Sequence, residues 1–403
     1  TVMSQLALKH NATNLGQGFP DFPMSETLID CVTEAMKAGG NQYAHTNGVP
    51  LLRERLAGKI NSIYATAINP ETEITITPGG TYAIFSAFST IIQPGDEVIM
   101  PSYTFVSTAN AFVLRGAKIV FCDSRKDHPG MDEDVIETLI TPKTKAIVPV
   151  HYAGVACDMD KIMDLANKYN LFVIEDAAQA IDSYYTGKDG VKRPLGSIGH
   201  LAAFSFHETK NVIAGEGGLL AINDEKYLER AEIIWEKGTN RASFFRGEIN
   251  KYGWVDTGSS FLPSEIIAAF LWSQLENLIT IQNKRRTIWE YYFNGLQALA
   301  QQGKLHLPQI PSYASNNAHM FYLVCDSLAT RSALIAHLKS QDIHAVFHYL
   351  SLNKSEFYLK NNEVLTLPNA DRFTDALVRL PFYYDLNILE QQKVVQAIHE
   401  FYV

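Results

Sequence analysis

The chain has 403 residues, more than one compact core of ordinary size accommodates, so we expect a large and a small domain. Its hydrophobic content of 46% is typical of proteins with a large core. The formal net charge of -9 argues against nucleic acid or an anionic membrane surface as the main partner. No apolar run is long enough to span a membrane, and the first residues do not form a signal peptide. Because the cysteines show no paired spacing, we expect buried, reduced thiols in a cytoplasmic protein; they are Cys31, Cys122, Cys157 and Cys325.

Short apolar runs alternate with helical patterns between residues 74 and 222. The runs are EITIT, DEVIMP, KIVFCD, AIVPVHY, LFVIEDAA, AAFSF and GGLLAI. They are rich in Val, Ile and Phe and mostly do not alternate with polar residues, which favours strands buried on both faces of a mainly parallel sheet. The stretches between them, such as MDEDVIETLIT and DMDKIMDLANKYN, have the apolar spacing of helices. We therefore predict an α/β sandwich with its chemistry at the carboxyl ends of the strands.

A long helical pattern follows at residues 263–302, and its length predicts a break near Ile281. Strand and helix patterns then alternate again, as in a small α+β domain. We expect an N-terminal segment at 1–50, a large domain at 51–285 and a small C-terminal domain at 286–403.

The stretch TPGGTYAIFSAF reads as a strand, a turn and a helix, and its turn contains Gly79, Gly80 and Thr81. Glycines allow a close approach of the backbone, and free N–H groups at a helix start attract phosphate, although such a turn is commonly only a turn. Phe105 follows the next strand and could stack on a flat ring, although an aromatic there is more often part of the core.

Charged residues also follow two later strands. In LFVIEDAAQA the apolar run leads into Glu175 and Asp176, where a carboxylate is costly unless it is paired; the alternative for Asp176 is a helix N-cap. Lys210 lies between AAFSF and GGLLAI, where burial would make its amine nucleophilic; the alternative is a lysine whose head group reaches solvent. A phosphate cradle, a stacking aromatic, an Asp and a nucleophilic Lys are together what pyridoxal 5'-phosphate (PLP) requires.

From about residue 95 onward the chain resembles the PLP-dependent sugar aminotransferases of the DegT/DnrJ/EryC1/StrS type. The resemblance rests on VPVHYAGVACDMDKIM, FVIEDAAQA, FSFHETKN, AGEGG, NAHMFY, AVFHYL and the long stretch from EKGTNR to FLWSQLE. It implies the PLP-dependent transferase fold type I, a mainly parallel seven-stranded sheet sandwiched by helices with a smaller α+β C-terminal domain. Within the group, the chain is most similar to enzymes that form dTDP-4-amino-4,6-dideoxygalactose for enterobacterial common antigen.

The resemblance also implies roles for individual residues. Lys210 would bind PLP covalently and shuttle a proton, and Asp176 would pair with the ring nitrogen. The remaining assignments are Phe105 stacked on the ring, Gly79, Gly80, Thr81 and Ser205 at the phosphate, Gln179 beside the ring hydroxyl, and His151 in the same cleft. Many relatives have an Asn that reaches the phosphate of the neighbouring subunit, and here Ser260 of GSSFLPS stands at that position. The implied assembly is a homodimer with sites at the interface.

Residues 1 to about 95 instead resemble class I amino-acid aminotransferases near the methionine and kynurenine types. NLGQGFPDFP, NQYAHTNGVPLLRERLA and ITITPGGTYAIFSAF carry this likeness, which suggests a hybrid. It would place Gly18 near the substrate carboxylate and Tyr43 at the partner's cofactor phosphate. Arg372 and Arg379 lie in the half where class I enzymes carry a carboxylate-binding arginine. Their context, ALVRLPFYYDL, is of the sugar type, so we assign neither.

The leading hypothesis is transfer of an amino group from glutamate, leaving 2-oxoglutarate, to a dTDP-linked 4-keto-6-deoxyhexose. The alternatives are a class I amino-acid aminotransferase, an inactive hybrid or binding module, and a dehydratase of the same fold. The last is disfavoured because those relatives typically replace the lysine that Lys210 supplies.

Overall fold

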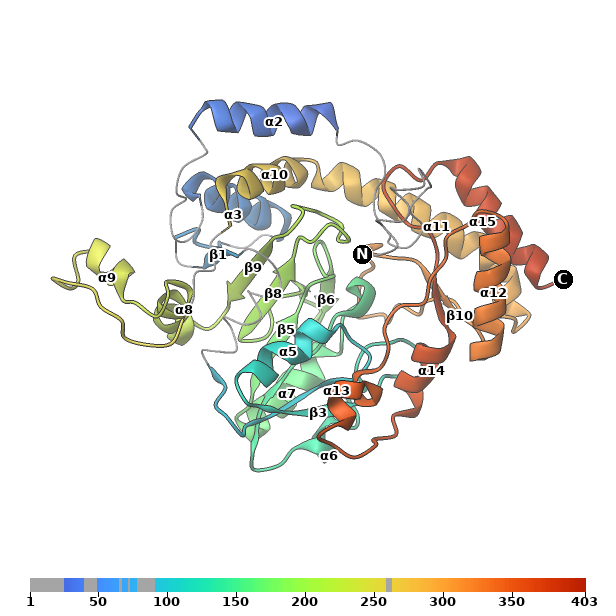
Figure 1. Ribbon diagram of the computed structural model, residues 1–403, viewed down its shortest axis with the longest axis horizontal. Helices are drawn as coiled ribbons and strands as arrows, with labels where there is room; N and C mark the ends of the chain where they lie inside the picture. Colours follow the sequence, from blue (N-terminus) through green and yellow to red (C-terminus); the bar gives the residue numbers. More distant parts are fainter. Residues whose placement is uncertain (1–24, 40–48, 65–66, 72, 78–90, 259–262) are drawn as a thin grey trace.

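The computed structural model describes residues 25–39, 49–64, 67–71, 73–77, 91–258 and 263–403 (Figure 1). A seven-stranded sheet lies at the centre, in the order β1-β9-β8-β5-β4-β2-β3. Its strands are β1 (Ile74–Thr77), β2 (Glu97–Pro101), β3 (Lys118–Cys122), β4 (Thr144–Ile147), β5 (Phe172–Asp176), β8 (Leu201–Ser205) and β9 (Gly218–Ile222). β9 pairs antiparallel with both β1 and β8, and the pairs from β8 to β3 are parallel. All seven apolar runs of the sequence therefore form strands, and the mainly parallel sheet is confirmed.

Neighbouring residues of one strand enter different hydrophobic cores, which shows that both faces of the sheet are covered. In β2, Val98 and Ile99 lie in separate clusters, and in β5 the same is true of Val173 and Ile174. The helices on the two faces include α5 (Val106–Leu114) on one side and α7 (Met159–Tyr169) on the other. This burial on both sides explains why the strands lack polar alternation.

One strand and one helix are shorter than the sequence predicts. The run AIVPVHY forms strand only to Ile147, because Pro149 has no N–H for a ladder bond, and pairing resumes as one bridge at Val150. The helix expected over residues 131–141 is reduced to α6 (Ile136–Leu139). Met131 instead forms a bridge with Ser124, and residues 133–135 form a turn that leads into α6.

The front of the described chain packs on the same body as the rest. α2 (Glu26–Lys37) lies along α10 (Glu265–Glu276), and α3 (Pro50–Tyr64) lies between α10 and β1 (Figure 1). The α3 side chains of Leu52 and Leu56 share a buried cluster with Ile76 and Leu271. α3 and β1 are thus part of the core around β9 and α10.

The long helical region breaks at Asn277, four residues before the expected position. α10 ends at Glu276 and α11 (Leu278–Gln301) follows. The Asn277 side chain donates to the Ser273 carbonyl, which supplies a partner at the end of α10. Because α11 continues through residue 286, the expected domain boundary there stays a prediction.

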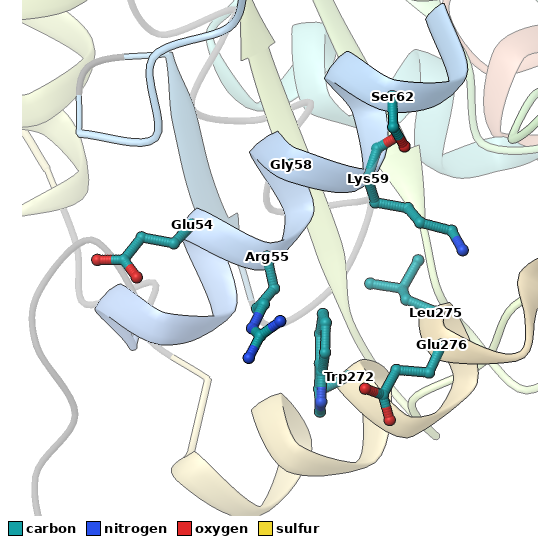
Figure 2. A pocket seen from close by; sticks show the side chains of 8 residues that line it. All are labelled: Glu54, Arg55, Gly58, Lys59, Ser62, Trp272, Leu275 and Glu276. Atoms are coloured by element: carbon teal, nitrogen blue, oxygen red, sulfur yellow. The ribbon is translucent and has the colours of Figure 1, made fainter.

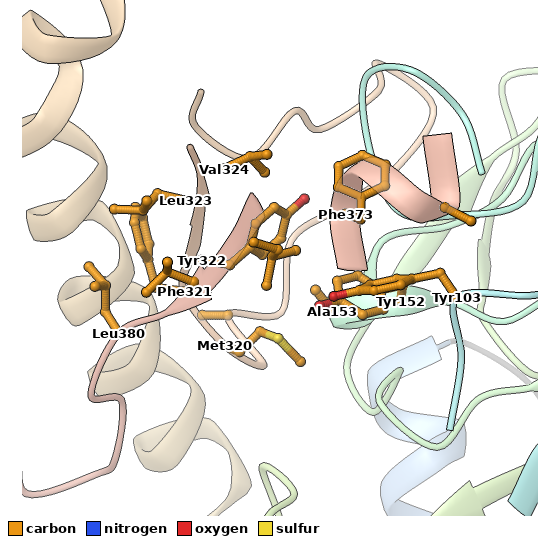
Figure 3. Close-up of a cluster of buried hydrophobic side chains, with 14 of the residues drawn as sticks. Tyr103, Tyr152, Ala153, Met320, Phe321, Tyr322, Leu323, Val324, Phe373 and Leu380 are labelled. Carbon is orange, nitrogen blue, oxygen red and sulfur yellow. The ribbon is translucent and has the colours of Figure 1, made fainter. Parts of the chain in front are cut away.

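The C-terminal part adds a small sheet and further helices. β10 (Tyr322–Val324) pairs antiparallel with β11 (Leu377–Arg379). Its helices are α12 (Leu328–Ser340), α13 (Glu356–Leu359), α14 (Pro368–Ala376) and α15 (Ile388–Phe401). Elsewhere lie the unexpected hairpin of β6 (Tyr184–Thr186) and β7 (Lys192–Pro194), and the helices α8 (Leu228–Trp235) and α9 (Arg241–Phe245). Aromatic rings of Tyr103, Tyr152, Tyr322 and Phe373 pack where the large sheet meets this part (Figure 3).

Within the described ranges, no helix has the length and apolar character needed to cross a bilayer. The four cysteines are unpaired; three are buried as expected, whereas Cys31 is partly exposed.

Candidate active site

Asp176 ends β5 at the carboxyl edge of the sheet. The residue is 6% exposed, and its Oδ2 accepts a 2.6 Å hydrogen bond from the Thr108 hydroxyl. Its Oδ1 accepts a 3.1 Å bond from the backbone N–H of Ala178. Each carboxylate oxygen has two lone pairs, so Asp176 keeps capacity for another donor.

Lys210 lies in the turn that follows β8, where its backbone N–H bonds to the His207 carbonyl. Removal of water lowers the pKa of its amine to about 8, with a contribution from the charge of Arg379 and against the attraction of Asp176. A pKa of about 8 leaves much more neutral, nucleophilic amine near neutral pH than an ordinary lysine has. The solvent-reaching alternative for Lys210 is disfavoured.

A buried network fixes the chain next to Lys210. The Oδ1 of Asn211 accepts from His319 Nδ1 across 2.6 Å, and its Nδ2 donates to Gln282 and to the Asn317 carbonyl. Burial holds the pKa of His319 well below its usual range, and the charge of Lys210 acts in the same direction. A neutral His319 adds no charge beside the lysine.

Phe105 is the N-cap residue of α5, and Thr108 lies in the first turn of that helix, where its hydroxyl reaches Asp176. Phe105 is 55% exposed, and its ring centroid lies 6.0 Å from that of Tyr349 in a tilted arrangement. The expected alternative of a buried core aromatic does not hold. An exposed ring at the start of the helix whose Thr108 bonds Asp176 is available to stack on a flat heterocycle.

Gln179 is joined to the C-terminal part. Its Oε1 accepts from the backbone N–H of Ala153 at 2.6 Å, and its Nε2 donates to the Tyr349 hydroxyl at 3.0 Å. Tyr152 reaches the same region, since its hydroxyl lies 2.6 Å from His348 Nδ1.

His151 is fully buried, and its Nε2 lies 2.9 Å from Glu175 Oε2. Burial would raise the pKa of Glu175, but the bonds from His151 and from the backbone N–H groups of Gly196 and Gly199 outweigh it and keep that pKa below its usual value. The structure thus gives His151 a partner inside the fold, and its place in a cofactor cleft stays a prediction.

Ser205 ends β8, and its Oγ accepts a 3.4 Å bond from the His207 N–H. The other sequence assignments lie outside the described residues: Gly79, Gly80, Thr81, Tyr43 and Ser260. Their roles also stay predictions.

Sequence reasoning assigned no role to Tyr152, His348, Tyr349 or Arg379. NAHMFY and AVFHYL carry the family likeness, but only the folded chain brings AVFHYL against Gln179 and the strand ends. Arg379 could have been identified from its place at the end of the apolar strand LVR. Burying a guanidinium there costs free energy unless the group has a partner.

A surface cavity of about 400 Å³ lies elsewhere, between α3 and α10 (Figure 2). Arg55 stacks over the Trp272 ring there, 5.4 Å from its centroid, with Lys59 and Glu276 beside them. Neither Lys210 nor Asp176 lines this cavity, so it is separate from the candidate active site.

The described residues fit PLP. An amine with a pKa of about 8 lies in the field of a buried carboxylate that has free lone pairs, and an exposed aromatic ring lies at the start of the helix whose Thr108 bonds that carboxylate. These are the groups that bind an aldehyde, a pyridinium nitrogen and a ring face.

Comparison with known proteins agrees with this geometry. Residues 64–399 match the model of the DegT/DnrJ/EryC1/StrS aminotransferase family. An aminotransferase from Psychrobacter cryohalolentis superimposes with a TM-score of 0.84 at 24% identity, covering 96% of this chain and 98% of that one. DesV of S. venezuelae gives 0.79 at 26% identity, covering 93% and 94%. Spr1654 of Streptococcus pneumoniae, solved in its PLP form, gives 0.80 at 23% identity, covering 94% and 96%.

Proposed function

The chain belongs to the DegT/DnrJ/EryC1/StrS aminotransferase family of PLP-dependent sugar aminotransferases, and from this premise we propose its substrates. The donor is glutamate, which leaves as 2-oxoglutarate. The acceptor is dTDP-4-keto-6-deoxyglucose, which becomes dTDP-4-amino-4,6-dideoxygalactose. The observation that carries the transaminase chemistry is the low-pKa amine of Lys210 in the field of the buried Asp176.

PLP, when bound, supplies an electron-withdrawing ring that stabilises negative charge on the neighbouring carbon. Asp176 holds the proton on the ring nitrogen, and Thr108 holds Asp176 in place through their 2.6 Å bond. Lys210 binds the cofactor aldehyde. Once the donor amine had displaced it, the Nζ of Lys210 would take the proton from the α-carbon of glutamate and deliver it to the cofactor carbon that carried the aldehyde.

The remaining residues position the cofactor. Phe105 covers one face of the ring, and Gln179 orients its hydroxyl. We assign the phosphate to Ser205 and to the turn of Gly79, Gly80 and Thr81, and place His151 in the same cleft. In a homodimer, Tyr43 and Ser260 approach the phosphate of the partner's site.

We also propose a cytoplasmic location and a role in making enterobacterial common antigen or a similar lipopolysaccharide component. The free cysteines suit a reducing compartment. The likeness of NAHMFY and AVFHYL to the dTDP-4-amino-4,6-dideoxygalactose enzymes supports the choice of sugar.

A second candidate is an α-amino-acid aminotransferase of class I type. The family match begins at residue 64, so the earlier residues, which resemble class I enzymes, lie outside it. In this hybrid the front segment would set specificity.

The visible spectrum of the purified enzyme tests both candidates. Added glutamate should bleach the cofactor band, and dTDP-4-keto-6-deoxyglucose should restore it. Restoration only by an amino-acid-type keto acid would favour the second candidate. Absence of any cofactor band would mean that the hybrid does not assemble a site.

A further inference from the structure

Arg379 enters the site from the C-terminal part. It ends β11, opposite Tyr322 of β10, and its backbone exchanges two hydrogen bonds with Val346. That pairing sets the chain that runs on to His348 and Tyr349, which contact Tyr152 and Gln179. The strand pairing therefore brings a guanidinium toward the edge that carries Asp176 and Lys210.

Among the residues that the structure describes, the guanidinium of Arg379 forms no ion pair. Its Nε is buried and finds no acceptor among the described residues. The arginines that form ion pairs across those residues are Arg53, Arg125, Arg193, Arg230, Arg246 and Arg286, and Arg379 is not among them. A partly buried cation without a carboxylate costs free energy, so its pairing with a ligand would recover some of that cost.

The groups around Arg379 do not neutralise it. Burial, followed by the charge of Arg379, holds the pKa of His348 well below its usual range, so that ring is neutral. Burial raises the pKa of Tyr349 and keeps its hydroxyl protonated, although Arg379 acts in the opposite direction. Arg379 is therefore a permanent positive charge close enough to Lys210 to be felt by its amine.

We propose that Arg379 binds the α-carboxylate of the amino donor. The α-carboxylate is attached to the same carbon as the reacting amine, so it must lie next to Lys210. The diphosphate of a dTDP-linked sugar is attached at C1, across the ring from the reacting C4, and falls farther away. A guanidinium also matches a carboxylate with two parallel hydrogen bonds.

This inference rests on the proposed function, since it requires an amino-acid donor. The two are tested separately. Bleaching of the wild-type cofactor band by glutamate tests the function without involving Arg379. Calorimetric titration of the holoenzyme with glutarate, which has both carboxylates of glutamate but no amine to react, tests the inference. Titration with dTDP measures the affinity of the nucleotide-binding part of the site.

Arg379→Gln should weaken glutarate binding about 10- to 100-fold, the loss expected for a charged hydrogen-bond pair, and leave dTDP binding unchanged. Arg379→Lys keeps the charge without the two-pronged geometry and should give a smaller loss. Arg193→Gln, which removes an exposed ion pair with Asp189 in the β6–β7 hairpin, is the control and should change neither.

Three results would overturn the inference. Unchanged glutarate binding in Arg379→Gln would remove the carboxylate contact. Weakened dTDP binding with glutarate unchanged would assign Arg379 to the diphosphate. Equal weakening of both probes would indicate a general disturbance of the site, because a carboxylate contact predicts a difference.

Discussion

Two parts of the molecule face Lys210, and they carry different kinds of side chain. The edge of the large sheet offers Asp176, whose carboxylate is held by hydrogen bonds from Thr108 and Ala178. The neighbouring Glu175 is instead bonded to His151 and to backbone N–H groups within the fold. The C-terminal part offers Arg379, whose Nε has no acceptor in the described chain. Hydrogen bonds within the fold fix the position of the Asp176 carboxylate, whereas the unpaired guanidinium of Arg379 has capacity for an anionic ligand. We infer that the sheet edge serves the cofactor and the C-terminal part serves the substrate.

The largest loss of activity is expected at Lys210, since both the sheet edge and the C-terminal part act on its amine. Lys210→Ala removes the amine that binds the aldehyde and moves the proton, so turnover should fall to background. The visible cofactor band should be lost while the urea midpoint is retained. Normal turnover by this variant would exclude Lys210 from the mechanism.

Asp176→Asn comes next, and it tests the cofactor side alone. Loss of a charged hydrogen bond worth about 3 kcal/mol predicts at least about a 100-fold fall in kcat. The cofactor band should persist, because Lys210 is intact. Unchanged kcat would remove Asp176 from the reaction.

Glu175→Gln sharpens the contrast between neighbouring carboxylates. Glu175 is fully buried and accepts from His151 and from backbone N–H groups, so an amide in its place leaves donors facing donors. We expect a loss of about 3 kcal/mol in the free energy of unfolding, measured by urea denaturation. Asp176→Asn is the matched variant. If it destabilised the protein as much as Glu175→Gln does, the division of roles would be wrong.

Thr108→Val removes only the hydroxyl that donates to Asp176. One such bond is worth about 1.5 kcal/mol, so kcat should fall about tenfold with little change in the KM for glutamate. A larger change in KM than in kcat would instead place Thr108 on the substrate side.

The smallest effect is a shift in pH dependence. Only the neutral amine of Lys210 binds the aldehyde, and the neutral fraction rises with pH, so cofactor binding by the cofactor-free protein should become faster through about pH 8. Because the charge of Arg379 helps to lower this pKa, Arg379→Gln should move the midpoint upward. An unmoved midpoint would mean that the two parts are not electrostatically coupled at Lys210.

The helix and strand errors show where local pattern fails. MDEDVIETLIT has helical spacing, yet it starts with a bridge and a turn, because Met131 pairs with Ser124, a partner that the pattern within the stretch does not reveal. The break near Ile281 lies at Asn277 because a side chain there bonds a helix carbonyl. In each case, contacts outside the periodic pattern fixed the boundary.

The sequence by itself determined the strands, their burial on both faces and the candidacy of Lys210 and Asp176. These follow from apolar runs and from charges at strand ends, which are local features. The partners of those charges, and the place of Arg379, were decided only by the tertiary structure. Asp176 meets Thr108 from 68 positions earlier, and Gln179 meets Tyr349 from 170 positions later. The sequence indicates which charged residues are buried and therefore need partners, but only the folded chain shows which groups are those partners.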